Sequence, residues 1–110
     1  MKRVVVESYR VSIFMVGSFW QAEAICLDYC NEVGLCVTVT KTNYSYTGGR
    51  AAGVIVGLIN YPRFPSTPEA IWARAEELAA RLRERLRQQS YTIQAPDKTV
   101  WFSHRHEDAS

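Results

Sequence analysis

The chain has 110 residues, of which 47% are hydrophobic and 22% are charged, and its formal net charge is +2. This length fits a single domain, and this composition supplies a hydrophobic core and excludes global disorder. The small net charge excludes the broad electrostatic field of a general nucleic-acid-binding protein.

Residues 2–16 have the apolar and β-branched composition of a strand. The early valines Val4 and Val6 occupy even positions, whereas the apolar residues from Val11 onward occupy odd positions. Successive side chains of a strand point to opposite faces, so a bulge or bend is predicted near residues 7–9. In the second half, Val11, Ile13 and Met15 form one face, and Arg10, Ser12 and Phe14 form the other.

The apolar run at the N-terminus is interrupted by Glu7, Ser8 and Arg10 before it reaches the length of a signal-peptide core. No stretch approaches the roughly 20 apolar residues of a membrane span. The three cysteines are an odd number, which agrees with a reducing compartment. We therefore expect a cytoplasmic protein without a membrane partner.

A first helix is predicted between Ser18 and Gly34. Ser18 suits the N-cap, and Gln21, three residues later, completes a capping box. Gly34 supplies the left-handed residue that ends many helices. One face of this helix is apolar and is formed by Ala22, Ile25, Cys26, Tyr29, Cys30 and Val33.

Residues 35–59 read as a long β-hairpin. Its first strand alternates over residues 35–47, and a turn is predicted over Thr47–Gly53. The following run, Val54–Ile59, is apolar at every position except Gly57, which is typical of a central strand covered on both faces. The polar face of the first strand carries Thr38, Thr40, Thr42, Tyr44 and Tyr46.

A second helix is predicted to begin after Thr67, with Pro68 in its first turn. Its buried face consists of residues spaced three and four apart, and arginines gather near its C-terminal end, where the helix dipole favours them. Residues 91–102 then form two strands around a type I turn at Ala95–Lys98. Residues 104–110 are predicted to be a flexible C-terminal tail.

The predicted order is β-α-β-β-α-β in a single α+β domain over residues 1–103. Two interleaved right-handed βαβ units of this order give a ferredoxin-like fold, an antiparallel sheet with both helices on one face. The pattern allows an extra edge strand at each end. The open face of the sheet would carry the threonines and tyrosines of residues 38–46. We expect a partner subunit to cover it, because a domain this small gains stability from extra burial in a homodimer or larger oligomer.

Five runs of sequence carry a resemblance to a known group of proteins: GLCVTVT, YTGG, GVIVGLINYPRFP, AEELAARL and PDKTVWFS. Together they resemble a family of small, uncharacterised proteins encoded in tailed bacteriophages and prophages. The resemblance spans roughly residues 11–103. It implies a phage accessory gene acting in the host cytoplasm, and it implies no reaction and no site residues.

The exit from the apolar strand, residues 60–65, concentrates side chains able to recognise a ligand. The two prolines in it fix an extended backbone. Arg63 offers a planar fork for a phosphate or carboxylate, near the N-terminus of the second helix, and Tyr61 and Phe64 offer rings for stacking on a base. The alternative is a simple strand-to-helix connection with Arg63 on the surface. The predicted ligand-binding residues are Asn60, Tyr61, Arg63 and Phe64.

The hairpin tip is the second candidate for an anion site, because consecutive backbone amides in Thr47, Gly48, Gly49 and Arg50 can cradle an anion. The alternative, which we favour, is a turn in which the glycines supply positive φ. The tip matches neither a Walker loop nor a dinucleotide fingerprint, since no helix follows it.

Three other groups favour structural roles. Cys26 and Cys30 lie on the apolar helix face and read as buried free thiols rather than zinc ligands with His104 and His106. The arginines of residues 81–87 alternate with glutamates and indicate a solvated helix face. No catalytic residues, metal ligands or cofactor site are predicted.

These observations predict a non-catalytic binding module that acts during infection. Its partner would be a host defence protein or an anionic nucleotide that serves as a defence signal. The competing hypotheses are a small nucleotide-cleaving enzyme and a structural or morphogenetic phage protein. We prefer the non-catalytic interpretation because no Ser-His-Asp, Cys-His or paired-carboxylate arrangement in the sequence supports catalysis.

Overall fold

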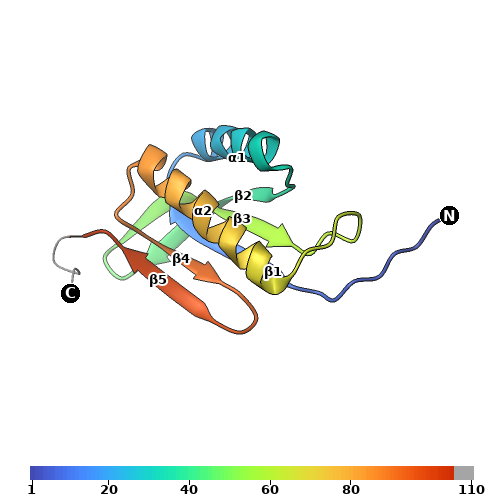
Figure 1. Ribbon diagram of the computed structural model, residues 1–110. Coiled ribbons are helices and arrows are strands. Elements are labelled where there is room, and N and C mark those ends of the chain that lie inside the picture. Colours follow the sequence, from blue (N-terminus) through green and yellow to red (C-terminus); the bar gives the residue numbers. More distant parts are fainter. Residues whose placement is uncertain (106–110) are drawn as a thin grey trace.

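The computed structural model describes residues 1–105 as seven elements of secondary structure in one layer of helices and one of strands (Figure 1). Their bounds are β1 (Arg10–Val16), α1 (Phe19–Val33), β2 (Thr38–Tyr46), β3 (Gly49–Ile59), α2 (Pro68–Leu86), β4 (Ser90–Gln94) and β5 (Thr99–Ser103). The sheet is antiparallel, with the strand order β2-β3-β1-β4-β5, and both helices cover the same face. The ferredoxin-like fold is therefore confirmed, with β5 as an extra edge strand.

The predicted helix ends are confirmed, although the described residues show only the Ser18 half of the predicted capping box. The Ser18 hydroxyl accepts a hydrogen bond from the Gln21 backbone N–H at 3.4 Å, and Gly34 ends α1 with φ of 71°. The Thr67 hydroxyl accepts from the Ala70 N–H at 3.1 Å at the start of α2. In each N-cap the side-chain hydroxyl binds a backbone N–H of the first helical turn, which has no partner within the helix. Neither helix in residues 1–105 is long and apolar enough to cross a lipid bilayer.

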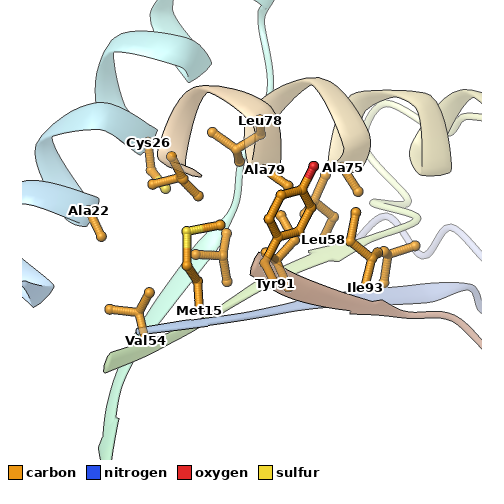
Figure 2. Close-up of a cluster of buried hydrophobic side chains, with 14 of the residues drawn as sticks. Met15, Ala22, Cys26, Val54, Leu58, Ala75, Leu78, Ala79, Tyr91 and Ile93 are labelled. Atoms are coloured by element: carbon orange, nitrogen blue, oxygen red, sulfur yellow. The ribbon is translucent and has the colours of Figure 1, made fainter. Parts of the chain in front are cut away.

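The hydrophobic core lies between the helices and the sheet, and Figure 2 shows its central part. Val11, Ile13 and Met15 of β1 point toward the helices, as the alternation of the sequence predicts. Because both helices pack on this one face, the other face of the sheet is open. The remaining core side chains include Tyr29 of α1, Val54, Val56 and Leu58 of β3, Leu78 and Leu82 of α2, and Ile93 of β4.

Residues 2–9 do not form the predicted strand, and β1 begins at Arg10. The reason is the ladder beside β1. Arg10 pairs with Ile59, the last residue of β3, so residues before Arg10 have no strand to join. Instead, the carbonyl of Tyr9 accepts a hydrogen bond from the Asn60 N–H at 3.0 Å.

The hairpin turn is also shorter than predicted. Residues Thr47 and Gly48 alone connect the strands, because Tyr46 already pairs with Gly49. The ladder continues through the small residues that had suggested a loop, and β3 begins at Gly49 instead of Val54. Of the predicted tail, residues 106–110 lie outside the described residues. His104 is attached to the domain, because its N–H donates to the Gln89 carbonyl at 2.7 Å.

Two buried titratable side chains of α1, Cys26 and Tyr29, should make the folded protein less stable at alkaline pH. Burial raises the pKa of the Cys26 thiol from 9.0 to about 12, and burial with the hydrogen bond to Glu77 raises the pKa of Tyr29 from 10.0 to about 12. The folded protein holds these protons more tightly than the unfolded chain, so this stabilisation is complete below pH 9 and is lost toward pH 12. We expect urea denaturation to show the free energy of unfolding falling over this range, by at most about 1.4 kcal/mol per pH unit for each group.

The matched variants are Cys26→Ala and Tyr29→Phe, each of which removes one titrating group. Each should be less stable than the parent at neutral pH and should lose less stability as the pH rises. An unchanged pH slope in the double variant would show that other groups control alkaline unfolding.

Candidate functional site

Asn60 is a structural link between three segments. Its side-chain Nδ2 donates to the Glu7 carbonyl at 2.8 Å, and its Oδ1 accepts from the Ser66 N–H at 2.9 Å. Its backbone N–H is bonded to Tyr9 as well. Asn60 therefore holds the N-terminal segment against the loop that leads to α2, and its carboxamide is occupied by the protein itself.

The rings of Tyr61 and Phe64 also contact each other, so part of each ring is not available to a ligand. Their rings are stacked, with centroids 5.3 Å apart and planes at 26°. The Tyr61 hydroxyl accepts a hydrogen bond from the Cys36 thiol at 3.2 Å, and this bond, followed by burial, raises the pKa of Tyr61. Phe64 is 45% exposed, so one of its faces is still open to a ligand.

These two rings border a cleft of about 240 Å³ between the loop, the end of α1 and the first turns of α2. Two of its polar side chains have partners, because Tyr61 is bonded to Cys36 and Arg74 lies 3.6 Å from Glu77. Arg63 is exposed and does not line this cleft. The remaining walls are mainly apolar: Leu35, Leu58, Ile59, Pro65 and Ile71.

The hairpin tip lies at the opposite end of the sheet from this cleft (Figure 1). The 11 residues of β3 separate Gly49 from Asn60, which at about 3.3 Å per residue is roughly 35 Å. Gly48 has φ of 88°, the conformation for which glycine is suited in a tight turn. Within one chain, Thr47–Arg50 and Asn60–Phe64 are therefore two separate sites, not one.

The open face of the sheet contains a third candidate site, which no motif in the sequence indicates. Ladder pairs place one row of side chains across all five strands, and Phe14 of the central strand β1 is its midpoint. Two hollows flank Phe14, one of about 500 Å³ and one of about 200 Å³. The row consists of Thr40, Ile55, Phe14, Thr92 and Trp101.

The larger hollow contains polar groups that lack partners among the described residues. Arg10 forms no ion pair with them, and the side chains of Ser12 and Gln94 form no hydrogen bond with them, although Ser12 is only 8% exposed. The signal in the sequence was the alternation of β1, which places Arg10, Ser12 and Phe14 on one face. Gln94 could not be added from the sequence, because the strand pairing that brings it beside Ser12 is not local.

The cysteines and the arginine cluster, which the sequence also offered as candidate ligands, have positions that fit structural roles. Cys26 is buried, Cys30 is half-buried, and Cys36 is exposed. Within residues 1–105, no three His, Cys, Asp or Glu side chains are arranged to hold a metal ion. Arg81 forms an ion pair with Glu32 of α1, so part of the arginine cluster ties the two helices together.

Among solved structures, the chain is similar in fold to a phage SAM lyase in the apo state, with a TM-score of 0.75 and 16% identity over 94% of each chain. It is also similar to a phage SAM lyase in complex with S-methyl-5′-thioadenosine, with a TM-score of 0.66 and 15% identity, covering 94% of this chain and 95% of the other. No protein-family model matches the chain, and no curated protein matches it significantly. At this identity the likeness establishes a shared fold.

Proposed function

We propose that this protein is a phage accessory protein that binds an adenine nucleoside of the S-adenosylmethionine (SAM) class in the host cytoplasm. By binding it, the protein would withdraw from the host a metabolite or signal used in defence. The observation that carries the proposal is the likeness in fold to a phage SAM lyase over 94% of both chains. The phage setting rests on that likeness and on the sequence motifs of residues 11–103.

Cleavage of the bound nucleoside is the second candidate function, and the same likeness favours it, since those structures are of a lyase. A lyase breaks a bond without adding water. The electron pair of the C–S bond leaves with the sulfur as a neutral thioether, and the chain that is released either loses a proton to a base to form an alkene or closes on its own carboxylate to form a lactone. Neither step requires a nucleophilic side chain from the protein. The lack of a recognisable catalytic set in the sequence therefore argues against hydrolysis more strongly than against this chemistry.

The test is titration calorimetry of the full chain with SAM, S-methyl-5′-thioadenosine and cyclic AMP, with product analysis by chromatography. We expect saturable binding of at least one adenine nucleoside and a thermal shift that grows with ligand concentration. Recovery of intact SAM after incubation supports binding alone, whereas release of S-methyl-5′-thioadenosine supports cleavage. If none of the three ligands binds at millimolar concentration, the proposed function is wrong.

We further propose that a second copy of the chain covers part of the open sheet face, where Tyr46 and Trp101 are 59% and 55% exposed. Burying such aromatic rings is a common source of association energy. Light scattering should find a dimer or larger oligomer at micromolar concentration, and the Trp101→Glu variant should shift it toward the monomer. A monomeric parent protein would contradict this proposal and would leave a host defence protein as the alternative partner for the face.

A further inference from the structure

We infer that the larger hollow on the open sheet face, lined by Arg10, Ser12, Phe14 and Gln94, is the site that takes the nucleoside. This inference rests on the proposed function and specifies its site. The ligand class is a purine base joined to an anionic group: the base stacks on Phe14, the Gln94 carboxamide binds its edge, and Arg10 binds the anion.

The strand register sets the order of these groups. Arg10, Ser12 and Phe14 are alternate residues of β1 and point to the same face. Gln94 of β4 is the ladder partner of Ser12, which places both side chains within about 5 Å of each other. The carboxamide and the hydroxyl therefore lie between Phe14 and Arg10, whose Cα atoms are about 13 Å apart along the strand. A base on Phe14 leaves the ribose over Ser12 and directs an anionic substituent to Arg10.

The walls of the hollow come from the strands on either side of β1. Ile55 borders it on the side of β3, and Ala95 and Pro96 border it on the side of β4. Gly57 of β3, the ladder partner of Ser12, does not line the hollow. The Thr38 side chain occupies the space over Gly57, where a Cβ would lie 2.6 Å from the Thr38 hydroxyl oxygen.

The polar groups of the hollow are more available than those of the loop cleft. Ser12 is more than nine-tenths buried, and its hydroxyl makes no hydrogen bond to another described residue. None of the described side-chain polar atoms is both fully buried and without a partner, so the Ser12 hydroxyl is accessible from the hollow and can bind a ligand hydroxyl or ring nitrogen. Arg10 likewise forms no ion pair with another described residue, whereas Arg74 of the loop cleft lies 3.6 Å from Glu77. An aromatic ring at one end of the hollow and a guanidinium at the other favour a ligand with a planar group at one end and an anionic group at the other.

The experiment compares three ligands that share the adenine base. SAM carries a carboxylate, AMP carries a phosphate, and S-methyl-5′-thioadenosine carries no anion. With the full chain, Arg10→Ala should weaken binding of the ligand whose carboxylate or phosphate Arg10 contacts by about ten- to a hundredfold. It should leave the affinity for S-methyl-5′-thioadenosine within about twofold of the parent's. Whether SAM or AMP shows the loss identifies the anion as carboxylate or phosphate.

Phe14→Leu, which keeps an apolar side chain in the sheet, should lower the affinity for every ligand that binds by about fivefold or more. Arg63→Ala is the matched control for Arg10→Ala, because Arg63 is an exposed arginine outside the hollow, and it should bind like the parent. If the parent binds these ligands but Arg10→Ala and Phe14→Leu bind as well as the parent, the site inference is wrong and the proposed function stands. If the parent binds none of them and does not bind cyclic AMP either, both are wrong.

Discussion

Replacing Tyr29 by alanine should lower the free energy of unfolding by about 3–5 kcal/mol, the range for removing a large aromatic side chain from a core. Tyr29 is 0% exposed and lies on the face of α1 that packs toward α2. Its hydroxyl donates to the Glu77 carboxylate at 2.7 Å, and the Arg81 guanidinium carbon lies 5.0 Å from the centre of its ring. The substitution therefore removes ring packing and a hydrogen bond between the helices at once, and urea denaturation measures the loss.

Tyr29→Phe separates these contributions, because it keeps the ring and removes only the hydroxyl. We expect it to cost about 1 kcal/mol, since the Glu77 side chain is 52% exposed and water can replace the lost partner. A loss in Tyr29→Ala no larger than in Tyr29→Phe would mean that the ring contributes nothing to the packing of α1 on α2. That result would contradict the arrangement of the two helices described above.

The elements that the sequence predicted well are those whose signals are local. Ser18 and Gly34 bracket α1, and Thr67 and Pro68 begin α2, because capping depends on residues within one turn of the helix end. The alternation of residues 38–46 likewise fixed which side chains of β2 face away from the helices. The segment before Arg10 had the apolar and β-branched composition of a strand and still formed none, because strand formation depends on a neighbouring strand that the local sequence does not contain.

The hollow beside Phe14 was not predicted from the sequence, for the same reason. Residues 60–65 were conspicuous because several recognition side chains are adjacent in the sequence. The structure shows that Asn60 and Tyr61 make hydrogen bonds within the protein. The hollow beside Phe14 requires Ser12 and Gln94 to be ladder partners although 82 positions separate them (94 minus 12). Side chains that a sheet brings together from distant strands leave no compact motif in the sequence.

Replacing Gly53 by valine should destabilise the protein by about 1–3 kcal/mol or more, although valine is ordinarily a favourable strand residue. A Cβ at Gly53 would lie 2.5 Å from the Met15 carbonyl oxygen, 2.5 Å from the Tyr44 ring and 2.9 Å from the Val16 Cα. Two of these three atoms belong to the backbone of β1, so a rotamer change cannot relieve the overlap. The Tyr44 ring is also held, because its hydroxyl donates to the Val54 carbonyl at 2.5 Å.

Ala52→Val is the matched control, because Ala52 precedes Gly53 in β3 and is exposed. A surface substitution of this kind should change the free energy of unfolding by no more than about 0.5 kcal/mol. The overlap in Gly53→Val should also displace Tyr44, which borders the smaller hollow beside Phe14 with Trp101. We therefore expect Gly53→Val to shift the NMR signals of the Tyr44 ring as well as the urea midpoint. Equal stability of the two valine variants would mean that β3 lies farther from β1 at this position than the ladder requires.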